Sequence, residues 1–394
     1  MSEPTPPSAF ESISQPVSQS ASLPVSEPRP LSPLQEQDDL VCPLSLEFPY
    51  AWGGPVGHAQ LRAEPEDFQV EEILGFEPEG EGEHHFLWIR KRGNNTDWVA
   101  RQLARFAQVG FNAVSYSGMK DRHAVTLQWF SVHIPGLDSP DWSAFCIEGV
   151  EILKAIRHRK KLKRGVHRAN KFAIRLRNFE GDQLAIESLL DRIATQGVPN
   201  YFGEQRFGRK GNNLSKAVAR VEAGESLKLS KRDKDGRAMM LSALRSWLFN
   251  RLLAERIEQG NWQAWLEGDV ATFSGSRSQF SIELGDDDVQ RRLEEGIIHP
   301  TGPLWGAGEP KVTGTARALE AEVASRYPEL ITGIESAGLN PERRALRLIP
   351  EHLHWDWNQG DLVLSFMLPV GTFATSVLRE AVEWNSSFTE AEDR

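Results

Sequence analysis

The strand-like and helix-like segments of this 394-residue chain break off near residue 197 and return near residue 362. Before the break, residues 83–93 and 124–134 predict strands, and the second of these is rich in β-branched and aromatic side chains. Residues 94–110 have apolar side chains at helical spacing between an Asn or Thr cap and a final Gly. Because these elements are interspersed without a regular βαβ rhythm, the pattern favours an α+β fold over a doubly wound sheet.

The part of the chain after the break has a different character. Residues 237–260 have the longest amphipathic helix pattern, and the following segment to about residue 340 is rich in Gly, Asp and Glu with weak periodicity. Residues 362–384 then return to a strand, a turn and a helix. We therefore expect a second domain inserted into the first, with boundaries at 44–195 and 347–394 for the discontinuous domain and 196–346 for the insertion.

The first 43 residues are rich in Ser, Pro and acidic side chains and predict a disordered tail. The net charge of the chain is −10, but acidic residues gather in this tail and at the C-terminus. By contrast, residues 154–177, the basic segment, contain no acid. Such a segment is typical of a protein that contacts phosphates in nucleic acid, although a nuclear-import-like run or a solvated loop gives the same pattern.

Several classes of protein are disfavoured by what the sequence lacks. No window reaches the ~18 unbroken apolar residues of a membrane helix, and the N-terminus has no basic and apolar secretory pattern. The two cysteines, Cys42 and Cys146, are too few for a disulfide framework or a zinc site. His84 and His85 are adjacent and would point to opposite faces of a strand, so we expect no metal there. These features predict a cytoplasmic protein without membrane or metal.

One short stretch, SYSGMKDRHAVTLQWFSV at 115–132, places the lone carboxylate Asp121 among cations at the entrance of a predicted strand. An aspartate that nearby positive charge keeps ionised can serve as a nucleophile or a base. In extended backbone Lys120 and Arg122 point away from Asp121, so a cation remote in sequence is the better partner. Taken alone, the same triplet is more typical of a surface turn.

A second stretch, GVPNYFGEQRFGRKGNN at 197–213, interleaves aromatic side chains with cations in a glycine-rich loop. Aromatic rings beside cations are suited to an unstacked base and its phosphate. The commoner alternative is a loop whose aromatic side chains fill a core.

Six stretches stand in order along the chain: AEPEDFQVEE, GEGEHHFLWIRKRGNNT, SGMKDRHAVTLQWFSV, ANKFAIRLR, GVPNYFGEQRFG and GTFATSVLRE. Together they resemble the motifs of the tRNA pseudouridine synthase D (TruD) family, from about residue 48 to residue 383. The resemblance implies a pseudouridine synthase fold: α+β, with a mixed, mainly antiparallel sheet interrupted by an inserted α+β TRUD domain. That expectation agrees with the break near residue 197.

The activity implied by the resemblance is isomerisation of uridine 13 of tRNA to pseudouridine, by a monomer with no obligatory protein partner. The reaction gains no atoms, so it implies no cofactor and no metal. The resemblance makes Asp121 the catalytic aspartate, which either attacks the nucleoside or removes a ribose proton. The target base must leave the RNA stack to be reached, at roughly a few kcal/mol.

The resemblance also implies roles for other side chains. Arg62 should pair with the aspartate, at a position where other family members have lysine. The substrate-binding residues implied with it are Phe68, Asn170, Phe373 and, packed beside the base, Phe172. From their charge and position we predict that RNA is bound by Lys120, Arg122, Arg159, Lys160, Lys161 and Arg206. The alternatives are an RNA-binding protein without activity and a hydrolase with an aspartate nucleophile.

Overall fold

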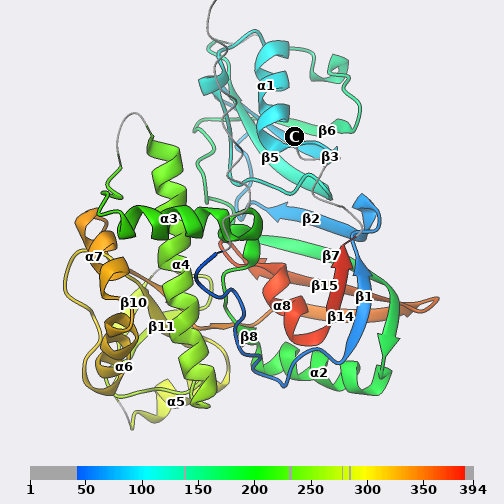
Figure 1. The fold of residues 1–394 in the computed structure, drawn as a ribbon. Coiled ribbons are helices and arrows are strands. Elements are labelled where there is room, and N and C mark those ends of the chain that lie inside the picture. Colours follow the sequence, from blue (N-terminus) through cyan, green and yellow to red (C-terminus); the bar gives the residue numbers. More distant parts are fainter. Residues whose placement is uncertain (1–41, 137–138, 230–232, 277, 284, 387–394) are drawn as a thin grey trace, which may run out of the picture. The chain divides into compact units, whose positions relative to one another are not determined.

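The computed structural model of the protein, drawn in Figure 1, describes residues 42–136, 139–229, 233–276, 278–283 and 285–386. The predicted tail of residues 1–43 lies outside the described residues except for Cys42 and Pro43.

A large mixed sheet forms the first part of the fold, and its strands follow the order β14-β15-β7-β2-β5-β3-β6. Neighbouring strands along this order are antiparallel except β2 and β5, which run parallel. The α+β fold with a mixed, mainly antiparallel sheet is therefore confirmed. The strands are β14 (Glu351–Asn358), β15 (Asp361–Pro369), β7 (Ala169–Gly181), β2 (Phe68–Ile73), β5 (Val125–His133), β3 (His84–Arg92) and β6 (Val150–His158). Beside them, β1 (Gly57–Leu61) pairs with β7 and β16 (Glu383–Ser386), and β4 (Val114–Tyr116) pairs with β5.

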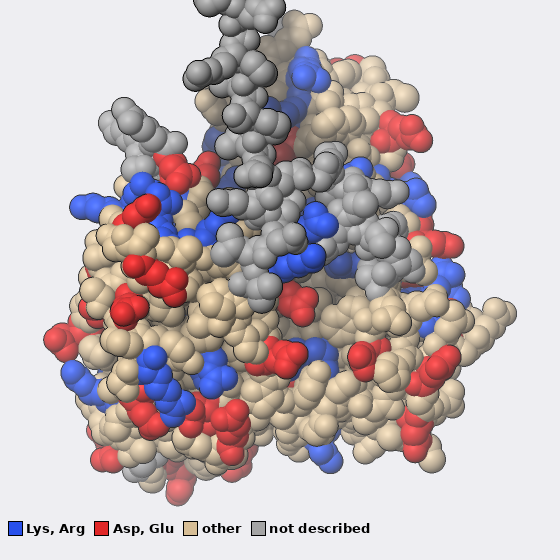
Figure 2. Space-filling model, in the orientation of Figure 1, with Lys and Arg blue, Asp and Glu red and all other residues tan. Residues whose placement is uncertain are grey.

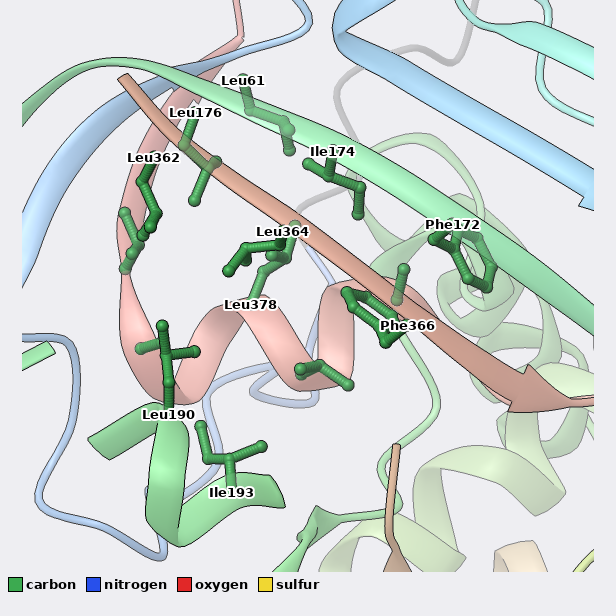
Figure 3. Close-up of a cluster of buried hydrophobic side chains, with 14 of the residues drawn as sticks. Leu61, Phe172, Ile174, Leu176, Leu190, Ile193, Leu362, Leu364, Phe366 and Leu378 are labelled. Carbon is green, nitrogen blue, oxygen red and sulfur yellow. The ribbon is translucent and has the colours of Figure 1, made fainter. Parts of the chain in front are cut away.

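Two hydrophobic clusters cover one face of this sheet at its two ends. At one end, α2 (Gln183–Gln196) and α8 (Ala374–Ala381) pack on β7 and β15, and Figure 3 shows the leucine and phenylalanine side chains between them. At the other end, α1 (Thr96–Phe106) packs on β3 and β5. Burial of these apolar faces is the main stabilising contribution to such a sheet. Between the two clusters lies the loop that carries Asp121.

The second part of the fold is built around the long helix α4 (Lys234–Glu258), which the sequence predicts at 237–260. Around it lie α3 (Asn212–Glu222), α5 (Asp287–Glu294), α6 (Gly314–Ser325), α7 (Pro328–Ser336) and a four-stranded sheet of β10 (Gln279–Ser281), β9 (Val270–Phe273), β11 (Ile298–Leu304) and β12 (Glu342–Ala345). These short elements occupy the segment whose periodicity is weak, because each is too brief to give a clear pattern. Its own hydrophobic cluster centres on Trp247 and Phe249.

The chain enters and leaves this second part at one place. Strand β8 (Val198–Pro199) pairs with β13 (Arg347–Leu348), so that Val198 lies opposite Leu348. The break near residue 197 in the sequence pattern therefore coincides with a two-stranded connection between the first part and the second.

The segment of residues 42–52, which we call the strap, joins the two parts. Cys42, Leu44 and Phe48 pack on the cluster around Trp247, and Trp52 packs on both that cluster and the one beneath α8. The indole nitrogen of Trp247 donates to the carbonyl of Ser45 at 2.8 Å. The amides of Ala51 and Trp52 donate to the buried carboxylate of Glu380 in α8, at 2.8 and 3.3 Å.

No helix in the described part of the chain is long and apolar enough to cross a membrane.

Candidate active site

Asp121 lies in the loop of residues 117–123, the Asp121 loop, between β4 and β5. Three buried side chains bond to the main chain of this loop. Thr96 Oγ1 accepts from the amide of Lys120 at 3.0 Å, and Gln128 Nε2 donates to the carbonyl of Gly118 at 3.2 Å. Lys91 Nζ donates to the carbonyl of Asp121 at 2.8 Å. These three hydrogen bonds fix the main chain of the loop, and a catalytic group needs such a fixed support if it is to be precisely oriented.

The carboxylate of Asp121 has a cationic partner from the end of β1. Arg62 Nη2 lies 2.6 Å from Asp121 Oδ2, while the amide of His123 donates to Asp121 Oδ1 at 3.1 Å. The side chain of Asp121 is 32% exposed and that of Arg62 is 22% exposed, so the pair is half-buried and open to a substrate. The pair places a positive charge directly against the carboxylate that would act as nucleophile or base.

The backbone of Arg62 is strained. Its φ angle is 59°, in the left-handed region that few non-glycine side chains adopt. The guanidinium lies 4.1 Å above the ring of Phe68, in a cation–π arrangement, while it reaches Asp121. Strain of this kind is found most often at functional sites, where the surrounding contacts fix the conformation.

Lys120 occupies a place that the sequence does not predict. Its Nζ lies 2.9 Å from Glu72 Oε2 in β2, and the exposed fractions of the two side chains are 7% and 0%. An ammonium in a buried ion pair is not available to a phosphate, so the RNA-binding role predicted for Lys120 does not fit its position. Lys120 instead ties the Asp121 loop to the central strand of the sheet.

The predicted substrate-binding residues Phe68, Phe172 and Asn170 lie on β2 and β7 beside this loop. The rings of Phe68 and Phe172 meet edge to face at 6.1 Å, and Phe172 stacks on Phe366 at 5.4 Å. Asn170 lies directly across from Glu72 in the pairing of the two strands. Its Oδ1 is buried and has no hydrogen-bond partner among the described residues. A buried acceptor without a partner is uncommon and marks a place where a ligand can donate.

Phe373 and Arg206 lie together in another group of side chains. The guanidinium of Arg206 lies 5.8 Å from the ring centroid of Phe373 and 5.3 Å from that of Phe202. Burial lowers the pKa of Arg206, and its Nη1 donates to Ser242 Oγ at 3.0 Å. Arg206 is therefore a partly buried support for Phe373 rather than a freely exposed cation.

The aromatic side chains of the loop at 197–213 belong to the core. Tyr201, Phe202 and Phe207 are 2%, 7% and 1% exposed and form part of the cluster around Trp247. The interpretation of these rings as a stacking surface for bases is therefore wrong, and the commoner alternative holds. Spacing alone does not show which way a ring points in an irregular loop.

The remaining predicted RNA-binding residues lie at the surface. Arg159, Lys160 and Lys161 follow the end of β6 and are exposed, and Arg159 is paired with Glu79 and Glu81. Arg122, in the Asp121 loop, donates from Nε to the carbonyl of Gly93 at 3.3 Å. Figure 2 shows Lys and Arg side chains on both the sheet part and the part around α3 and α4, with acids interspersed around α5 and α6.

The sequence does not predict the buried side chains that support the loop, although it contains a signal for them. Along β3, Lys91 continues the face of Leu87 and Ile89, and along β2, Glu72 continues the face of Phe68 and Val70. A charged side chain on an apolar face of a strand indicates that the charge is buried and has a polar partner.

Within the described ranges, no group of three His, Cys, Asp or Glu side chains is arranged to hold a metal ion.

Comparisons with known proteins add to this geometry. A model of the tRNA pseudouridine synthase D (TruD) family matches residues 48–225 and 228–381. The tRNA pseudouridine synthase D of Methylococcus capsulatus is 47% identical over 345 residues, which are 87% of this chain and 96% of that protein. That of Aeromonas salmonicida is 47% identical over 338 residues, 86% of this chain and 94% of the relative. A crystal structure of a tRNA pseudouridine synthase D (TruD) from Methanosarcina mazei is 25% identical, has a TM-score of 0.65 and covers 84% of this chain and 95% of its own.

Proposed function

The chain belongs to the tRNA pseudouridine synthase D (TruD) family, and from this premise we propose that it converts uridine 13 of tRNA to pseudouridine with Asp121 as the catalytic carboxylate. At the coarser level it is a tRNA pseudouridine synthase, an isomerase. The target position, the roles of the site residues and the monomeric, cytoplasmic state are parts of the proposal.

In the proposed reaction, all the bonds that change are in the uridine itself. Uracil is detached from C1′ of its ribose, turns, and is rejoined through C5, while the hydrogen of C5 is lost and N1 gains one. Substrate and product are isomers, so the reaction consumes no oxidant, reductant or co-reactant. What it needs from the protein is one well-placed carboxylate and a pocket that holds the detached base.

The observation that carries the proposal is the half-buried pair of Asp121 and Arg62, 2.6 Å apart, on a loop fixed by buried bonds. Arg62 places its positive charge against the carboxylate that either route uses. In one route the carboxylate attacks the nucleoside, and in the other it removes a ribose proton. Arg62 would also stabilise negative charge that develops on the base as it leaves.

We assign recognition of the base to the neighbouring strands. The buried Oδ1 of Asn170 would accept a hydrogen bond from N3 of uracil, and Phe172 and Phe68 would form the apolar wall of the pocket. Phe373, supported by Arg206, would contact the base from the loop that follows β15. A hydrogen bond and ring contacts of this kind offset the energy needed to unstack the uridine.

Contacts to the tRNA backbone are assigned to cations at the surface. Arg159, Lys160 and Lys161 would contact phosphates at a distance from the pocket, and Arg122 would contact them beside it. Lys120 is removed from this group because of its burial. We further propose that the sheet part, residues 44–195 and 347–394, is the catalytic domain, and that 196–346 is an inserted TRUD domain.

The proposal is tested with tRNA that carries tritium at C5 of its uridines, because isomerisation releases that label to water. Asp121→Asn should lower the release by several orders of magnitude and leave tRNA affinity within about 3-fold, since the carboxylate acts in the reaction rather than in binding. Asp141→Asn is the matched control: that carboxylate is exposed and accepts only from Ser143 among the contacts described.

Each outcome separates the candidate functions. Substantial release by pure Asp121→Asn would refute the role of Asp121. Free uracil in place of pseudouridine would indicate a hydrolase, and tight tRNA binding without any release by the wild type would indicate a binding protein. Mapping of pseudouridine at a position other than 13 would overturn the assigned target alone.

A further inference from the structure

A lysine side chain lies inside the main sheet, under the Asp121 loop. Lys91 is in β3, a strand with neighbours on both sides, and only 1% of the residue is exposed. Its side chain shares a face with Leu87 and Ile89, which are fully buried. Lysine is almost never buried in this way unless its charge is compensated, because desolvating an ammonium costs several kcal/mol.

The hydrogen bonds of Lys91 show what compensates it. Its Nζ donates to the carbonyls of Asp121 at 2.8 Å, Asn94 at 2.9 Å and Lys120 at 3.4 Å. An ammonium has three N–H donors, so these three bonds use all of them. Two of the acceptors belong to the Asp121 loop, and one is the carbonyl of Asp121 itself. The third, Asn94, precedes α1, so Lys91 joins the loop to the start of that helix.

The charge of Lys91 also reaches the carboxylate. Burial lowers the pKa of Lys91 from 10.5 to about 8, while the negative charge of Asp121 acts in the opposite direction. The two groups therefore interact electrostatically, although Arg62 is the partner that contacts the carboxylate directly.

The neighbours of Lys91 in the same strand are ordinary surface residues. Arg90 is paired with Glu151, and the two side chains are 56% and 54% exposed. Arg92 is paired with Glu66, and these are 56% and 47% exposed. Three consecutive cations thus lie in two different environments, and their described hydrogen bonds to the Asp121 loop come from the middle one, Lys91.

We propose that Lys91 is a positioning residue for the isomerisation: its ammonium fixes the main chain at Asp121, so that the carboxylate stays aligned with Arg62 and with the base. This inference rests on the proposed function of Asp121. Lys91 does not touch the substrate, and it acts through the residue that does. A displacement of about 1 Å at a reacting group can lower a rate about 100-fold.

The test compares Lys91→Met with Arg90→Met, which removes a cation from the next position of the same strand. The readouts are single-turnover tritium release from saturated enzyme–tRNA complex, tRNA affinity and melting temperature. We expect Lys91→Met to lower the single-turnover rate about 100-fold with affinity within about 3-fold, and Arg90→Met to leave both unchanged. Lys91→Arg, which keeps the charge and donors in a different shape, should recover part of the rate.

A wild-type rate in folded Lys91→Met would overturn the inference, as would a loss confined to affinity. If Lys91→Met does not fold, Lys91→Arg decides. A lowered rate in folded Lys91→Arg with normal affinity supports positioning, and a wild-type rate there shows that Lys91 only supports the fold. Wild-type enzyme that releases no tritium refutes the proposed function instead, so the two failures are distinguishable.

Discussion

The Asp121 loop and the basic segment are both rich in cations, yet the structure treats them in opposite ways. In the loop, Lys120 is 7% exposed and lies 2.9 Å from the fully buried Glu72. At the end of β6, Arg159 is 62% exposed, and its partners Glu79 and Glu81 are 41% and 63% exposed. The same residue types therefore serve to hold a catalytic loop in one region and to present charge to solvent in the other.

This difference shows that the contribution of a charged side chain to the free energy of unfolding depends on its partner and on its burial. Removing one member of a buried pair leaves an uncompensated charge in the interior, whereas an exposed pair is replaced by water and salt. The composition of the sequence does not distinguish a buried ion pair from an exposed one. Experiments that make the same substitution in the two regions can break or sharpen this contrast.

The largest effect on stability is expected for Lys120→Met compared with Lys160→Met. The first leaves the carboxylate of Glu72 buried without its cation and should lower the free energy of unfolding by about 3–5 kcal/mol. The second removes an exposed charge and should change it by less than about 0.5 kcal/mol. Urea titrations measure both. The double variant Lys120→Met/Glu72→Gln should regain part of the loss, and equal effects of the two single variants would remove the contrast.

A pH dependence should follow from Lys91. Its folded pKa, about 8, lies below the ordinary 10.5, so between these values the unfolded chain binds more protons than the folded one. Stability then rises with pH in this window, and it does not respond to Lys91 below it. The free energy of unfolding of the wild type should gain up to about 3 kcal/mol relative to Lys91→Met from pH 8 to 10.5. A difference that stays constant through the window would contradict this.

Affinity rather than stability should change in the basic segment. Replacing Arg159, Lys160 and Lys161 by Ala should weaken tRNA binding at low salt and reduce the log–log salt slope by up to about 3. The rate on saturated complex should stay the same. The control is Arg291→Ala/Arg292→Ala in α5, which also removes exposed cations paired with acids. A slope unchanged in the triple variant, or changed equally in the control, would argue against phosphate contacts there.

The smallest effect is expected for the exposed pair next to Lys91. A double-mutant cycle of Arg90→Ala and Glu151→Ala should give a coupling of about 0.2–1 kcal/mol, because water screens both side chains. Thermal or urea unfolding of the four proteins measures it. A coupling above about 2 kcal/mol would mean that exposure does not separate the two kinds of charge in this strand.

Part of this fold and site can be predicted from the sequence, because periodicity records which face is apolar. The break near residue 197 and helix α4 follow from that pattern. The pairing of Asp121 with Arg62 does not follow from periodicity, because the two residues are 59 positions apart. It can be predicted only from the family resemblance. The direction of the Lys120 side chain is not predictable either, because a loop has no period from which it can be read. Glu72 and Lys91, by contrast, are charged residues on apolar strand faces, a pattern that indicates buried side chains.

The strap has a consequence for the order in which the chain can fold during synthesis. Its residues leave the ribosome before the rest of the described chain, but their partners come much later. Ser45 bonds to Trp247, and the carbonyl of Phe48 accepts from Arg379 at 2.7 Å, across 331 positions. Contacts of such long sequence separation form late, because the intervening chain must be ordered first. The first described residues to be made are thus among the last to form their contacts, and α8 must emerge before the end of the sheet that α2 and α8 cover is complete.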